Sequence, residues 1–134
     1  MFMPYLADND GYLLPSVIFH GLMGIEKNEI IANTAVGVAN PTGLTETFCI
    51  SAVEFEAAGV PVVSKQTSGI TDTVISGQTG ILVNNEHELT DTIIKLLTDQ
   101  TLNVTLGDAA RSFVQNTFSP NFIIKDWLRL FDSL

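Results

Sequence analysis

Positive charge is scarce in this sequence. Six Lys and Arg residues face 15 Asp and Glu residues over 134 positions, which gives a formal net charge of −9. The six are spread along the chain, and no arginine precedes position 111: they are Lys27, Lys65, Lys95, Arg111, Lys125 and Arg129. Such a chain lacks the basic patch with which proteins bind nucleic acid or an anionic membrane surface. An anionic ligand would have to be held by backbone dipoles or by residues that this sequence does not contain.

The sequence has little cysteine, no long apolar run and no cluster of metal-ligating residues. The single cysteine, Cys49, excludes an internal disulfide and fits a reducing compartment. The longest apolar stretch, 12–25, is broken by Pro15 and His20, so no membrane span is expected, and the start lacks the features of a signal peptide. No set of His, Cys, Asp and Glu has metal-ligand spacing. We therefore expect a cytoplasmic protein without a bound metal.

The residues that are present suit one folded domain or a part of one. Apolar residues make up 46% of the chain and charged residues 16%, which favours a buried core over a disordered acidic tail. Short apolar runs predict strands at 16–19, 35–39, 60–63 and 81–83, and helical patterns separate them at 26–33 and 48–58. Strands that are apolar on both faces and alternate with helices predict a Rossmann-like parallel sheet with helices on both faces, an α/β fold.

The C-terminal third is expected to be helical. Asn85 and Glu88 have the spacing of a capping box, and Ser119 followed by Pro120 predicts an N-cap with proline in the first turn. Another helix is expected around 102–114. Apolar residues at helical spacing predict a buried side for the first of these helices: Leu89, Ile93, Ile94, Leu96 and Leu97. The last helix carries five apolar residues: Phe122, Ile123, Trp127, Leu130 and Phe131. The apolar side of the last helix must pack against something.

The stretch 40–64 carries the chemical signal. A strand is expected to end at Asn40, a glycine-containing loop follows, and a helix is predicted to begin near Glu46 or Thr47, at the sheet edge where ligands bind. Free amides at a helix start attract phosphate or sugar oxygens. Glu46 and Glu54 would then lie on one row, about 12 Å apart along the helix. Spacing alone leaves two interpretations open: carboxylates that accept sugar hydroxyls, or an acidic helix start followed by solvated Glu54 and Glu56.

Several ordered motifs resemble a known family. Glu46 is followed by T-F-C-I-S-A-V, then Glu54, then F-E-A-A and G-V-P-V-V-S at 59–64. Downstream stand S-G-I-T-D-T-V at 68–74 and G-Q-T-G-I-L-V at 77–83, and upstream V-I-F-H-G at 17–21. Over roughly 16–131 the chain resembles the later part of the donor-binding domain of family 4 retaining glycosyltransferases, which have the GT-B fold. Many relatives have glycine where this chain has Cys49.

The resemblance implies roles for particular residues. Glu54 would accept hydrogen bonds from the ribose hydroxyls of a nucleoside-diphosphate sugar, and Glu46, as the catalytic carboxylate, would contact hydroxyls of the transferred sugar. The donor-binding backbone would run through Thr47, Phe48, Cys49 and Ile50, and the base would lie against Leu22 and Met23. Lys27 falls near a position that is basic in some relatives. The donor is a substrate, so no cofactor is expected, and Cys49 is interpreted as a small buried residue rather than a nucleophile.

The resemblance also implies missing parts. Residues 1–134 would form a partial C-terminal nucleotide-sugar-binding domain, without the N-terminal acceptor domain and without the family's phosphate-binding Arg and Lys. We therefore predict that the isolated chain is inactive and binds nucleotide sugars weakly, and that uncovered apolar surface favours a homo-oligomer. The alternative is a non-catalytic interaction or regulatory module derived from a glycosyltransferase. That alternative would require loss of the carboxylate pair or of the glycine loop, and both are present in the sequence.

Overall fold

The computed structural model describes residues 9, 10, 12 and 14–134. Its centre is a parallel sheet of three strands in the order β1-β2-β3: β1 (Gly37–Ala39), β2 (Val62–Lys65) and β3 (Gly80–Val83). Gly37 pairs with Val62, and Val62 pairs with Gly80. The parallel sheet predicted from sequence is confirmed, with narrower strand bounds. All three strands end at the same edge, so the loops that follow β1 and β2 lie together there.

Helices cover both faces of this sheet. α3 (Ile50–Ala57) and the short 3₁₀ helix η1 (Ser68–Asp72) pack on one face, in a cluster with Val62. α4 (Glu86–Thr98) and α5 (Gln100–Thr117) pack on the other face, in a cluster with Val63. Neighbouring residues of β2 thus contact opposite layers, because successive side chains of a strand point to opposite faces. Two further helices lie within the described residues: α2 (Lys27–Ala32), ahead of β1, and α6 (Pro120–Asp132), at the C-terminal end.

A helix cap and a close backbone contact shape these layers. Asn85 begins α4 as predicted: its Oδ1 accepts from the Glu88 amide at 2.9 Å, and Glu88 in turn accepts from the amide of Asn84. Gly107 of α5 lies so close to the carbonyl of Gly59 that a Cβ on Gly107 would overlap it. The end of α3 and the middle of α5 are therefore in backbone contact.

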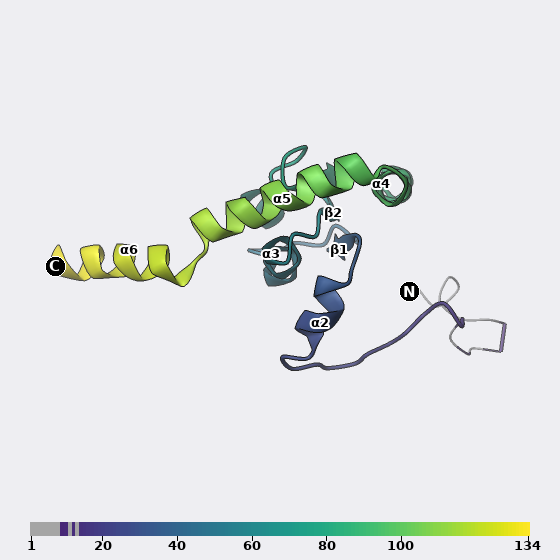
Figure 1. Cartoon of the computed structure of the whole chain (residues 1–134), viewed down its shortest axis with the longest axis horizontal. Coiled ribbons are helices and arrows are strands. Elements are labelled where there is room, and N and C mark those ends of the chain that lie inside the picture. Colours follow the sequence, from purple (N-terminus) through teal and green to yellow (C-terminus); the bar gives the residue numbers. More distant parts are fainter. Residues whose placement is uncertain (1–8, 11, 13) are drawn as a thin grey trace.

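The strand predicted at 16–19 is wrong. The segment has no regular structure, with Ile18 74% and Phe19 83% exposed, and it runs away from the sheet ahead of α2 (Figure 1). A strand needs a neighbour for its backbone hydrogen bonds. Within the described residues, no strand of the sheet pairs with this segment.

The buried side predicted for α4 needs correction, and the apolar side of α6 is uncovered. Leu96 of α4 is buried, but Ile94 and Leu97 are exposed, because only one stripe of this helix faces the sheet. α6 extends from the body of the molecule (Figure 1), and its apolar residues are exposed, including Trp127 at 55%. Ser119 is the N-cap residue of α6 as predicted, but its side chain makes no capping hydrogen bond.

Glu56 lies in the core, although one interpretation of the sequence placed its carboxylate in solvent. It is fully buried near the end of α3, and its Oε1 accepts a hydrogen bond of 2.6 Å from the hydroxyl of Thr79. That hydroxyl also accepts from the Ile75 amide at 3.0 Å. The second oxygen, Oε2, has no hydrogen-bond partner within the described part of the chain. Burial raises the pKa of Glu56 to about 7, against the lowering effect of Thr79.

Candidate functional site

The loop between β1 and α3, residues 40–49, lies at the carboxyl edge of the sheet. Asn40 and Gly43 both have positive φ, 43° and 70°, which turns the chain immediately after β1. The side-chain Nδ2 of Asn40 donates to the carbonyl of Leu44 at 2.8 Å and to the Thr67 hydroxyl at 3.2 Å. The second bond reaches the segment that follows β2. The side chain of Asn40 therefore closes this loop and fixes it to the neighbouring strand connection.

The helix after this loop begins later than the sequence predicts. α3 starts at Ile50, and Cys49 before it has φ 61° in the left-handed region, which no helical residue adopts. Glu46 and Glu54 therefore do not share a helix row, because Glu46 precedes the helix. Cys49 is buried against Ala52 and Ile70, as expected for a small core residue. No side chain caps the start of α3, so its first amides are left for another partner.

Glu46 folds back onto the amides of its own loop. Its Oε1 accepts from the amide of Thr47 at 2.9 Å and from that of Phe48 at 3.4 Å. These bonds, that of Phe48 first, lower the pKa of Glu46 and keep it ionised. The Glu46 carbonyl also accepts from the Gly69 amide at 2.9 Å, and Gly69 has no room for a Cβ against the backbone of Glu46 and Thr47. Two neighbouring backbone segments therefore hold this carboxylate at the sheet edge.

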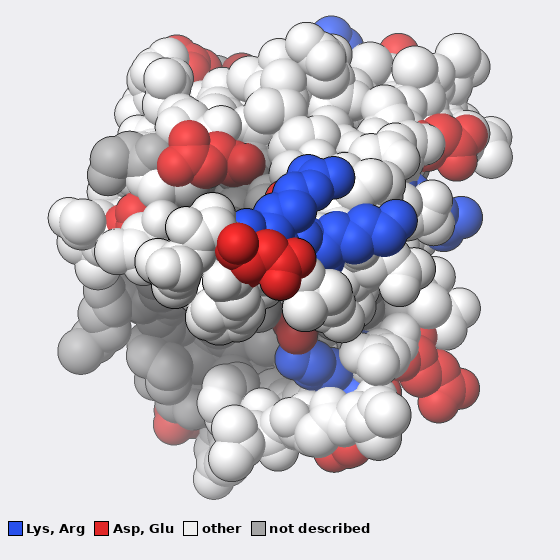
Figure 2. Space-filling model, turned by 90° about the vertical axis from the view of Figure 1, so that its left-hand side faces the viewer, with Lys and Arg blue, Asp and Glu red and all other residues white. Residues whose placement is uncertain are grey.

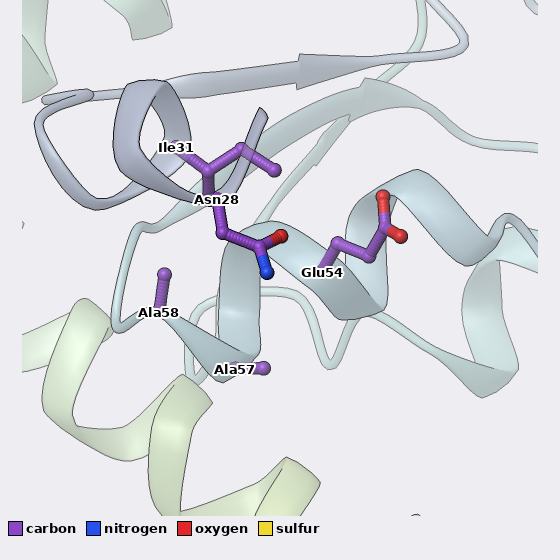
Figure 3. Close-up of a pocket in the computed structure, with 5 residues that line it drawn as sticks. All are labelled: Asn28, Ile31, Glu54, Ala57 and Ala58. Atoms are coloured by element: carbon purple, nitrogen blue, oxygen red, sulfur yellow. The ribbon is translucent and has the colours of Figure 1, made fainter. Parts of the chain in front are cut away.

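Glu54 lies one turn into α3, beside a hollow of about 280 Å³. The hollow is open to solvent between α2 and α3, and its walls are drawn in Figure 3: Asn28, Ile31, Glu54, Ala57 and Ala58. Lys27, the first residue of α2, places its Nζ 2.5 Å from Oε1 of Glu54. The two predicted carboxylates thus have different partners: Glu46 is bound to backbone amides and Glu54 to an ammonium group.

Leu22 and Met23 belong to the irregular segment that leads into α2. Gly21 before them has φ 68°; the Leu22 side chain is fully exposed and Met23 is half-buried. The structure joins this segment to α3 through the Lys27–Glu54 ion pair, four residues after Met23.

Two residues near the site were missed by the sequence interpretation. Phe118, after the last residue of α5, packs edge-on against Phe48, with ring centroids 5.3 Å apart, and against Phe113 at 5.6 Å. Lys65 ends β2 beside Gly43, with its side chain only 16% exposed and its Nζ 3.5 Å from Glu86. A polar residue at the end of a buried strand is a signal that could have indicated Lys65. The aromatic contact carries no sequence signal, because it joins distant positions.

The charge pattern agrees with the composition. Figure 2 shows the face at the α6 end, where uncharged residues cover most of the surface and the few basic side chains form no broad patch. Among the described residues, no three His, Cys, Asp or Glu side chains gather as a metal site would require. No helix within the described ranges has the length and apolar character to cross a membrane.

The comparison with protein families decides the identity. The model of the family "Glycosyl transferases group 1" matches residues 4–99, which is more than half of the chain. The chain belongs to the group 1 glycosyltransferases. The resemblance based on the carboxylate spacing and the glycine-proline motif is thereby confirmed.

Curated relatives of this glycosyltransferase chain are much longer than the chain itself. The capsular polysaccharide biosynthesis glycosyltransferase CapM of Staphylococcus aureus is 36% identical over 73 residues, which cover 53% of this chain and 19% of CapM. Trehalose synthase of Pyrococcus horikoshii is 25% identical over 118 residues, covering 87% of this chain and 28% of that enzyme. The chain thus spans less than a third of either relative.

Solved structures show the same fold. Sucrose-phosphate synthase of Thermosynechococcus elongatus superimposes with a TM-score of 0.78 at 29% identity, over 87% of this chain and 30% of that one. HepE of Anabaena, crystallised in complex with UDP-glucose, gives a TM-score of 0.82 at 23% identity, over 91% of this chain and 34% of HepE. The parallel sheet with helices on both faces is therefore part of a GT-B glycosyltransferase fold, as the sequence predicted.

Proposed function

We propose that this chain forms the donor-binding part of an enzyme that transfers a hexose from a nucleoside-diphosphate sugar to an acceptor with retention of configuration. Family membership supports glycosyl transfer, and the UDP-glucose complex of HepE supports this class of donor. The observation that carries the proposal is the sheet edge itself. There the loop with Glu46 meets the uncapped start of α3, and Glu54 lies farther along the same helix beside an open hollow.

The two carboxylates have chemistry suited to a sugar nucleotide. Vicinal hydroxyls are hydrogen-bond donors, and an ionised carboxylate is the strong acceptor that they require. In this proposal Glu54 accepts the ribose hydroxyls and Glu46 the hydroxyls of the transferred sugar. The backbone of Thr47, Phe48, Cys49 and Ile50 lines the sugar and diphosphate. The base lies against Leu22 and Met23, and the exposed side chain of Leu22 would be covered on binding.

The diphosphate requires more than this chain offers. The uncapped start of α3 supplies partial positive charge, but Glu46 already uses the amides of Thr47 and Phe48. We infer that residues 1–134 are part of the C-terminal domain. Further cations then come from the start of that domain, ahead of the motifs present here, and the acceptor site comes from an N-terminal GT-B domain. The isolated chain then transfers no sugar and binds the donor weakly. No bound metal or other cofactor enters this mechanism.

The test is a titration of the ¹⁵N-labelled chain with UDP-glucose, followed by NMR because weak binding is expected. Amide shifts should concentrate at residues 47–50 and 54, and Glu54→Gln should weaken binding by about tenfold, as for a lost hydrogen bond to a charged group. Glu29→Gln on α2 removes the same charge from an exposed position and is the matched control. Equal weakening by both variants, or shifts confined to other elements, would overturn the proposal. Micromolar binding by the wild-type chain would contradict the predicted weakness.

A further inference from the structure

The ion pair between Lys27 and Glu54 joins two elements that are separate in sequence. Lys27 is the first residue of α2, Glu54 lies on α3, and their charged atoms are 2.5 Å apart. Both side chains are partly shielded, with 40% and 34% of their surface exposed. A charge-assisted hydrogen bond this short limits the rotamers that the carboxylate can adopt. Glu54 is therefore held in place before any ligand arrives.

The pairing leaves part of the carboxylate available. Lys27 donates to Oε1 of Glu54, and each carboxylate oxygen can accept more than one hydrogen bond. The hollow beside Glu54 has Asn28 and Ile31 of α2 on one side, and Ala57 of α3 with its C-cap Ala58 on the other (Figure 3). α2 therefore forms a wall of the space that Glu54 borders. A carboxylate with a fixed orientation can receive two neighbouring hydroxyls without losing rotamer freedom on binding.

The ammonium group also changes the charge that a ligand meets. The chain carries a net charge of −9, and an unpaired carboxylate near a diphosphate would repel it. Lys27 compensates the charge of Glu54 locally, which lets this carboxylate act as an acceptor next to an anionic ligand. Lys27 also follows Leu22 and Met23 closely in sequence, so the same ion pair holds the proposed base-contacting segment next to α3.

We propose that Lys27 is a positioning residue for ribose recognition: it orients the Glu54 carboxylate toward the ribose hydroxyls of the donor and contacts no phosphate itself. The inference rests on the proposed function, because it assigns Glu54 to the ribose. The proposed role predicts that loss of Lys27 weakens binding of a nucleotide that carries the ribose 2′ and 3′ hydroxyls. A nucleotide that lacks these hydroxyls should bind nearly as before.

The experiment compares two probes, UDP and 2′,3′-dideoxy-UDP, by NMR titration of the chain. The wild type should prefer UDP by about tenfold, and Lys27→Met should reduce that preference to about twofold. Lys27→Arg should retain most of the preference, because a guanidinium can still donate to Oε1. Lys125→Met on the exposed α6 is the matched control and should change neither affinity. If Lys27→Met perturbs folding, Lys27→Gln is used, with the ¹⁵N spectrum as the check.

The outcomes separate the two proposals. If Lys27→Met still prefers UDP over dideoxy-UDP as the wild type does, the positioning role of Lys27 is refuted. It is also refuted if Lys27→Met binds both probes equally more weakly, a result that would indicate a phosphate contact. A preference that survives Glu54→Gln overturns the assignment of Glu54 to the ribose, and with it both proposals. If Glu54→Gln removes the preference and Lys27→Met does not, the proposed function stands and the positioning role is refuted. Loss of the preference in both variants, with rescue by Lys27→Arg, supports both.

Discussion

Glu56 should make the stability of this domain depend on pH in the direction opposite to that of most carboxylates. Its pKa is about 7 in the folded protein and 4.5 ordinarily, so between these values the folded state binds a proton that the unfolded state releases. Stability is therefore highest below the unfolded value and falls as pH rises through the window from 4.5 to about 7. At about 1.4 kcal/mol per pKa unit, holding the ionised form in the core costs about 3 kcal/mol.

The measurement is urea unfolding of wild type and Glu56→Gln at several pH values between 5 and 8. Relative to the variant, the wild type should lose about 2 to 3 kcal/mol of unfolding free energy over this range. Backbone amides lower the pKa values of Glu26, Glu46 and Glu88, which affects stability in the opposite direction. Because both proteins contain these three residues, their contributions cancel in the difference between wild type and variant. Glu29→Gln, which removes a charge from an exposed position, is the matched control. A difference between wild type and Glu56→Gln that stays constant from pH 5 to 8 would refute the reasoning.

Three further predictions concern the loop and the C-terminal helix. Gly69→Ala should displace the backbone at Glu46 and weaken UDP-glucose binding at least about fivefold, and unaltered NMR titrations would contradict this packing. Cys49→Gly should be more stable than Cys49→Ala by up to about 1 kcal/mol in urea unfolding. Both variants lose the thiol, but only glycine adopts the left-handed backbone conformation without strain. The reverse order of stability would count against that backbone conformation. The double variant Trp127→Glu/Leu130→Glu should reduce self-association in size-exclusion chromatography if the exposed apolar side of α6 pairs between copies, and identical elution of a dimer would exclude that face.

The sheet could be predicted from sequence because its strands are apolar on both faces. Val62 and Val63 pack in opposite layers, and this pattern is available from composition alone. The cap at Asn85 could likewise be predicted, since it depends on residues three apart. By contrast, the segment containing Ile18 and Phe19 has strand composition, yet composition does not supply the neighbouring strand that pairing requires.

The site was predicted less completely than the fold. The ordered motifs around Glu46 and Glu54 indicated the family, whereas the helix start was placed too early. The left-handed turn at Cys49 has no local sequence signal in a non-glycine residue. The burial of Glu56 was missed for a related reason. Its place beside Thr79 depends on how α3 packs against the turn before β3, and no spacing within α3 reveals it.

The aromatic contact at Phe118 has a consequence for how changes spread through the molecule. Phe118 follows the last residue of α5 and precedes α6, and its ring meets that of Phe48 in the loop that carries Glu46. A movement of α6 relative to α5 would therefore alter the support beneath that loop. Substitutions in the junction of these helices should then be judged by their effect on the sheet edge, even though α6 itself contributes no residue to the proposed site.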